Sequence, residues 1–305
     1  MAASPFSRRL AAVFACAAGA SCAQPAPESG PPLVVATIFP VADLVARIGG
    51  DAVRVETLLP PRASVHTWEA TPAQVRSLSH ARAYVTVGGG LDGWLEEFGA
   101  DVPALRTVCL TDGMRLRRAD EAHAGEGSGS GTSGDPHVWL DPVLVRDEIL
   151  PRIAALLVEL APGRRDALLA RAGAMADSLT VLDAEIRRLL AGRTRSGFVA
   201  THDAWSYFAE RYGLEVIGNL YEGPGHEPSA KGLARIVDAA RASGLRTVLS
   251  EPQLSEAAAR ALAAELNADV VLVDPLGGPG VPGRESYLDL MRFNARAFAR
   301  ALGST

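Results

Sequence analysis

Short apolar runs alternate with helical patterns along this sequence, and no other feature constrains its fold as strongly. Four runs lie in the first half of the chain and four in the second. They predict strands over residues 33–38, 53–59, 83–87 and 106–110, and over residues 197–201, 215–219, 246–250 and 269–273. Nearly continuous runs such as VVLV at 270–273 are typical of strands buried on both faces of a parallel sheet. The alternation of strands with helices predicts an α/β protein with parallel sheets.

A long helical pattern separates the two sets of strands. Apolar residues recur at helical spacing from Arg164 to Leu190, with Pro162 and Gly163 before the pattern and Gly192 after it. This length exceeds the roughly 8–20 residues of a usual globular helix, which favours a rigid connector. We therefore predict two lobes, each with a four-stranded, mainly parallel sheet flanked by helices. The predicted N-terminal lobe spans residues 33–162, the connecting helix 163–192 and the C-terminal lobe 193–305.

The N-terminus has the pattern of an export signal. Arg8 and Arg9 precede a short apolar stretch from Leu10 to Ala20, and small residues follow. That stretch is too short for the roughly 20 apolar residues that span a bilayer, but it suits a signal peptide. We predict a signal peptide over residues 1–23 and a Pro-rich tether over 24–32. Cleavage before Cys22 would leave a cysteine for lipid attachment, whereas cleavage after Ala23 would give a soluble periplasmic protein.

Charge and cysteine content exclude several classes of function. The formal net charge is −5, so the chain is a poor candidate for binding nucleic acid or anionic lipid through charge. Three cysteines are too few for a disulfide framework or a Cys-rich zinc module. Histidine and carboxylate side chains are therefore the metal ligands to look for.

Three histidines and one aspartate stand at or beyond the ends of predicted strands. His202 and Asp274 follow their strands without a gap, while His66 and His137 lie in the loops after theirs. Ligands bind at the carboxyl ends of strands in open α/β sheets. Three imidazoles and one carboxylate form a reasonable site for Zn²⁺ or a neighbouring transition metal. The alternative for each residue alone is a structural role at a strand end.

The remaining histidines are weaker candidates. His80 lies at a helix end and is expected on the surface. His123 lies beside Glu121 and Glu126, at the start of a flexible loop whose Gly/Ser-rich part is Gly125 to Gly134. Transient metal capture is the alternative to no role for this histidine. His226 lies in a Gly/Pro-rich turn, where it is a candidate for the mouth of a cleft.

A competing motif is the G-x-G-x-x-G pattern formed by Gly88, Gly90 and Gly93, with Asp112 further on. This pattern outlines a dinucleotide-binding fingerprint. It follows the third predicted strand instead of the first, and the helix after it is short. A tight strand-to-helix turn explains the motif better.

Nine sequence strings follow one another from Ala36 to the C-terminal helix pattern: ATIFPVADLVARIGGD, HTWEATPAQV, VGGGLDGWLE, DPHVWLDP, THDAWSYFAERYGL, EPSAKGLARIV, SEPQLSEAAARALAAEL, VLVDPLG and YLDLMRFNARAFARAL. Taken together, these strings resemble the zinc/manganese substrate-binding proteins of bacterial ABC transporters. The resemblance covers nearly the whole chain from Leu33 onward. It implies two α/β lobes bridged by one long helix, with one metal ion held between the lobes.

Carried over position by position, the resemblance puts the metal ligands at His66, His137, His202 and Asp274. Histidine at position 202 is the residue of the zinc-type members, whereas manganese-type members have Glu there. The sequence departs from the family in its short, histidine-poor loop before His137, and in Ser64-Val65 where Asp-Pro is usual. The short loop argues against a metal-scavenging role and leaves manganese or iron open as cargo. The Ser64-Val65 departure bears on how rigidly His66 is held.

The function implied is high-affinity binding of a divalent metal, Zn²⁺ first and Mn²⁺ second, and its delivery to an ABC permease. The resemblance implies a monomer that is not an enzyme, in the periplasm or on the outer face of the membrane as a lipoprotein. We expect Trp68, Trp139 and Trp205 to pack around the site, and Glu69 and Asp141 to orient its histidines. A zinc hydrolase and a surface adhesin are the alternatives.

Overall fold

The computed structural model describes residues 30–92, 105–117, 134–221 and 229–304. The predicted signal peptide, Cys22, His123 and His226 lie outside these residues. Pro31–Thr305 form one compact unit.

The described residues contain eight strands in two separate four-stranded sheets, and all eight lie within the predicted runs. The N-terminal sheet contains β1 (Leu33–Ala36), β2 (Arg54–Thr57), β3 (Ala83–Thr86) and β4 (Arg106–Cys109) in the order β2-β1-β3-β4. The C-terminal sheet contains β5 (Gly197–Ala200), β6 (Glu215–Asn219), β7 (Thr247–Ser250) and β8 (Asp269–Leu272) in the order β6-β5-β7-β8. Every strand pair is parallel. The predicted α/β fold with two parallel sheets is confirmed.

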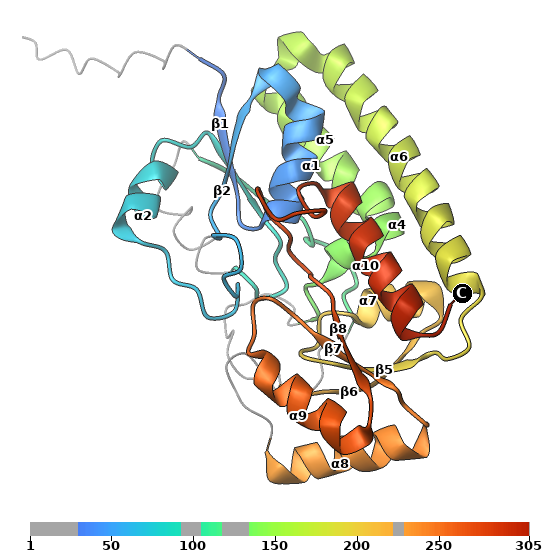
Figure 1. Cartoon of the computed structure of the whole chain (residues 1–305). Coiled ribbons are helices and arrows are strands. Elements are labelled where there is room, and N and C mark those ends of the chain that lie inside the picture. The colour runs from blue at the N-terminus through green and yellow to red at the C-terminus, as the bar shows by residue number, and fades with distance from the viewer. Residues whose placement is uncertain (1–29, 93–104, 118–133, 222–228, 305) are drawn as a thin grey trace, which may run out of the picture. The chain divides into compact units, whose positions relative to one another are not determined.

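Helices flank both sheets (Figure 1). Those of the N-terminal half are α1 (Phe39–Gly49), α2 (Pro72–Leu78), α4 (Pro142–Leu144) and α5 (Leu150–Leu160). Those of the C-terminal half are α7 (Ser206–Tyr212), α8 (Ala230–Ala242), α9 (Glu256–Leu266) and α10 (Tyr287–Ala301). Short helical turns lie at Gly50–Ala52 (η1), Val138–Leu140 (η3), Val145–Ile149 (η4) and Pro162–Arg164 (η5). Several helices begin at a serine that caps them, such as Ser255, whose side chain accepts from the backbone N–H of Ala257.

The long helix α6 (Arg165–Ala191) connects the two halves, as predicted. Its buried residues recur every three, four or seven positions and form one apolar stripe: Leu168, Met175, Leu179, Leu182, Ile186 and Leu190. Helix α6 contacts α1, α4 and α5 of the N-terminal half and α10 of the C-terminal half (Figure 1). Packing against both halves of the chain therefore holds the helix in place.

The largest hydrophobic core extends through both halves. It joins Val34 of β1, Leu182 of α6, Phe198 of β5 and Phe298 of α10 in one contact cluster. Helix α10 adds polar contacts to the N-terminal half, since the Tyr287 hydroxyl donates to the carbonyl oxygen of Trp139 over 2.8 Å. The backbone N–H of Tyr287 donates to Oδ2 of Asp43, also over 2.8 Å. The two sheets thus share one packed interior, and the predicted lobe boundaries stay predictions.

Within the described residues, no helix has the length and apolar character needed to cross a membrane.

Candidate metal centre

Three of the four predicted ligands meet in space. One nitrogen from each of His66, His137 and His202 lies within 4.8 Å of the corresponding nitrogens of the other two. The three ring centroids are 5.3–5.7 Å apart. His66 and His137 come from the N-terminal half and His202 from the C-terminal half, so the cluster lies where the two halves meet. Three converging imidazoles suit a divalent ion such as Zn²⁺.

His66 lies in the loop between β2 and α2. The backbone N–H of Trp68 donates to the carbonyl oxygen of Ser64 over 3.0 Å, which closes a turn around the histidine. His66 is half-buried, whereas His137 is almost fully buried. The Ser64-Val65 sequence before His66 is therefore part of a hydrogen-bonded turn that presents the imidazole.

His137 directly precedes the η3 turn, and Asp135 holds it in place. Oδ1 of Asp135 lies 2.9 Å from the backbone nitrogen and 2.8 Å from Nδ1 of His137, and accepts a hydrogen bond from each. A carboxylate can only accept, so Nδ1 carries the proton and Nε2 keeps its lone pair for a metal ion. Tyr207 supports this segment from the other half, because its hydroxyl donates to the carbonyl oxygen of Asp135 over 3.0 Å. Burial raises the pKa of Tyr207 to about 12, so it stays a donor at physiological pH.

His202 lies in the turn directly after β5, and Glu251 stands beside it at the end of β7. Oε2 of Glu251 is 2.7 Å from Nδ1 of His202, and its Oε1 accepts from the indole N–H of Trp205 over 3.2 Å. Burial lowers the pKa of His202, but the charge and hydrogen bonding of Glu251, together with smaller contributions from Asp203 and Asp135, outweigh that effect. The net pKa lies above the usual 6.5. A metal ion would therefore have to displace a proton from the His202 imidazole in order to bind it.

Asp274, the fourth predicted ligand, is not a member of the histidine cluster. It follows β8 and is buried, and its carboxylate is surrounded by donors. Oδ1 accepts from Nε2 of Gln253 and from the backbone N–H groups of Leu276 and Gly277. Oδ2 accepts from Nη1 of Arg284 over 3.0 Å. Its role as a ligand stays a prediction.

The carboxylates that orient the histidines differ from those expected. The prediction for Asp141 was wrong, because its carboxylate caps α4 and pairs with Arg211. Glu69 is exposed. The carboxylates that lie beside histidines of the cluster are Asp135, next to His137, and Glu251, next to His202. Glu251 directly follows a buried strand, and the rule that selected His202 and Asp274 selects it as well.

The predicted tryptophan environment is confirmed in part. The Trp139 ring lies 5.1 Å from the ring of His137, and its indole N–H donates to the carbonyl oxygen of Pro275 in the other half. Trp205 bonds to Glu251, as described above. Trp68 is half-buried and packs against the core. His80 is exposed, as predicted.

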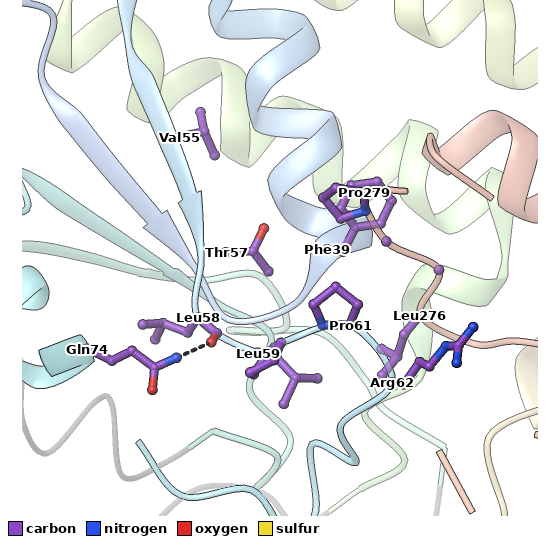
Figure 2. Close-up of a pocket in the computed structure, with 13 residues that line it drawn as sticks. Phe39, Val55, Thr57, Leu58, Leu59, Pro61, Arg62, Gln74, Leu276 and Pro279 are labelled. Carbon is purple, nitrogen blue, oxygen red and sulfur yellow. Dashed lines mark hydrogen bonds between the residues drawn. The ribbon is translucent and has the colours of Figure 1, made fainter. Parts of the chain in front are cut away.

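A cavity of about 450 Å³ lies beside the segment that precedes His66 and the segment that follows Asp274. Leu276 and Pro279 from the C-terminal half line it together with Pro61 and Arg62 from the N-terminal half (Figure 2). The amide of Gln74 donates to the carbonyl oxygen of Leu58 at its wall (Figure 2). None of the four predicted ligands lines this cavity, so it is distinct from the histidine cluster.

The two parallel sheets and the histidine cluster together place the chain in the class of two-lobed metal-binding proteins. The chain belongs to the family described as "Zinc-uptake complex component A periplasmic", or ZnuA, whose family model matches residues 34–301. The prediction of the family and of its zinc-transport function is confirmed at this level.

Individual relatives agree with this assignment. The chain is 30% identical over 308 residues to the high-affinity zinc uptake system protein ZnuA of Paracoccus denitrificans, covering 90% of this chain and 92% of that one. A crystal structure of ZnuA matches with a TM-score of 0.79 and 32% identity, covering 90% of this chain and all of that one. The manganese-binding lipoprotein MntA of Halalkalibacterium halodurans is 26% identical, covering 90% of both chains.

Proposed function

We propose that this chain captures a divalent transition metal, zinc in preference to manganese, outside the cytoplasmic membrane and delivers it to the permease of an ABC importer. The observation that carries the proposal is the convergence of His66, His137 and His202 from both halves of the chain. Neutral imidazoles are ligands that Zn²⁺ accepts readily, while Mn²⁺ favours oxygen donors. The metal is cargo: it binds, travels and is released.

In this proposal the three histidines hold the ion. Asp274 supplies a fourth ligand only when its Oδ2 exchanges Arg284 for the metal. All four side chains belong to one chain, so a monomer suffices. The protein is proposed to be a carrier and not an enzyme.

Zinc affinity measured by competition with a chromophoric chelator tests the proposal. His202→Ala should weaken binding by more than the ~10–100-fold that residues beside ligands typically contribute. His80→Ala is the matched control, because this histidine is exposed and outside the cluster. Equal zinc affinity in wild type and His202→Ala would rule out the site.

Delivery and the absence of catalysis need separate measurements. Uptake of radioactive zinc by cells that lack the chain should be restored by the wild type and not by His202→Ala. The Co²⁺-loaded protein should show no turnover of an activated ester. Turnover together with an exchangeable metal-bound water would favour a zinc hydrolase.

The anchoring mode depends on Cys22. Fractionation of cells expressing wild type and Cys22→Ala distinguishes the two forms that the sequence allows. Release of the variant from the membrane fraction would indicate a lipoprotein. A wild type that is already soluble in the periplasm would indicate cleavage after Ala23.

A further inference from the structure

The carboxylate of Asp274 uses its two oxygens differently. Oδ1 accepts from the Gln253 side chain over 2.9 Å and from two backbone N–H groups over 3.0 Å each. Oδ2 has one partner among the described residues, Nη1 of Arg284. The pair is sheltered from solvent, since the side chains of Arg284 and Asp274 are 12% and 2% exposed. Ion pairs are screened little in such surroundings, so Arg284 holds Oδ2 firmly.

Arg284 is itself fixed by the loop that follows β8. Its backbone N–H donates to the carbonyl oxygen of Val281, and its own carbonyl oxygen accepts from Gly278. Gly277 has a φ of +63°, and a Cβ there would lie 2.7 Å from the carbonyl oxygen of Arg284, so glycine permits this close packing. The guanidinium lies 4.6 Å from the centre of the Phe293 ring on α10. Arg284 is thus placed beside Asp274 by the fold.

Oδ2 of Asp274 can bind either Arg284 or a metal ion. This competition affects the selectivity of the site between Zn²⁺ and Mn²⁺. Three imidazoles alone suit Zn²⁺, whereas Mn²⁺ depends more on a carboxylate oxygen. We propose that Arg284 is a specificity-determining residue, which competes with the cargo ion for Oδ2 of Asp274 and thereby biases the site toward zinc over manganese. This inference rests on the proposed function, because it requires the three histidines to hold the ion.

Arg284→Met tests the competition, since methionine keeps length and removes the charge and the donors. The variant should bind Mn²⁺ at least ~10-fold more tightly, within the range by which neighbours of ligands change metal affinity, and Zn²⁺ should gain less. The zinc-to-manganese affinity ratio, obtained from competition on purified protein, is the readout.

The double variant Asp274→Asn/Arg284→Met separates competition from the general effect of removing a positive charge. The asparagine amide is a poor substitute for a carboxylate ligand, so the manganese gain should disappear in the Asp274→Asn background. Loss of the positive charge alone would raise the affinity for both ions in both backgrounds. An unchanged affinity ratio in Arg284→Met, or an equal manganese gain in both backgrounds, would overturn the proposal.

Two further variants guard against a folding defect. Arg284→Lys keeps the charge and should retain the wild-type ratio, while Arg284→Gln removes the charge but keeps a donor and should lie between wild type and Arg284→Met. Thermal unfolding without metal checks that each variant folds. Failure of the proposed function has a different signature: wild type and His202→Ala would bind zinc equally, whatever residue stands at position 284.

Discussion

The two halves of the molecule have sheets with the same strand order but carry their site residues in different ways. Each strand of the order β2-β1-β3-β4 has its counterpart in β6-β5-β7-β8. In the C-terminal half, His202, Glu251 and Asp274 stand within two residues of the ends of β5, β7 and β8. In the N-terminal half, His66 and His137 lie far beyond β2 and β4, in loops. We call His202, Glu251 and Asp274 the strand-mounted wall of the candidate site, because they stand at strand ends. His66 and His137 form its loop-mounted wall.

The carboxylates beside the histidines repeat this difference. Asp135 belongs to the same loop segment as His137 and binds both its backbone and its ring. Glu251 reaches His202 from a neighbouring strand, and Trp205 holds its other oxygen. The N-terminal side of the site depends on local hydrogen bonds, whereas the C-terminal side depends on the sheet.

The largest effect should follow from damage to the core that the halves share. Leu182→Ala removes a fully buried side chain from α6 and should lower the free energy of unfolding by about 2–5 kcal/mol. Val181→Ala, at a neighbouring position that is 55% exposed, should change it by no more than about 0.5 kcal/mol. Urea unfolding should show one transition for both halves. Two transitions, of which Leu182→Ala shifts only one, would mean that the halves are separate folding units.

Smaller losses should follow when the carboxylates beside the histidines are neutralised. Asp135→Asn and Glu251→Gln should each weaken zinc binding by about 10–100-fold, because each removes the acceptor charge behind a ligand. The loss should be greater for Asp135→Asn, since that carboxylate also fixes the loop backbone. Asp141→Asn is the control, as this buried carboxylate pairs with Arg211 outside the cluster. A greater loss for Glu251→Gln would contradict the distinction between loop and strand mounting.

The sequence predicts the strand-mounted wall more completely than the loop-mounted one. Buried apolar runs mark where β5 and β8 end, so His202 and Asp274 can be placed at a sheet edge from pattern alone. The convergence of His66 and His137 depends on loop conformations that periodicity does not encode, and only the family resemblance links them to the site. The positions of Asp135 beside His137 and of Arg284 beside Asp274 were missed because both depend on how a loop folds back on itself. Asp141 was misassigned because its helix-capping role could not be separated from a role beside His137.

Zinc affinity should depend on pH through His202 of the strand-mounted wall. Glu251 raises the pKa of His202 above 6.5, so this histidine is still partly protonated at a pH where an ordinary histidine is neutral. Zinc must then displace that proton in order to bind. Zinc affinity should therefore begin to fall above pH 6.5 as the solution is acidified. Glu251→Gln should move that decline to lower pH, even though it weakens binding at neutral pH.

The stability of the metal-free protein should change with pH in the opposite sense. A histidine with a raised pKa in the folded state binds its proton more tightly there than in the unfolded chain. The stabilisation is complete below the unfolded pKa of about 6.5 and is lost as the pH rises through the folded value. Urea unfolding at several pH values, with and without zinc, should show the two opposite trends in the wild type, and Glu251→Gln should weaken the metal-free trend. If Glu251→Gln had the same pH profiles as the wild type, Glu251 would not control the protonation of His202. The strand-mounted wall would then hold its histidine no more firmly than the loop-mounted wall holds His66 and His137.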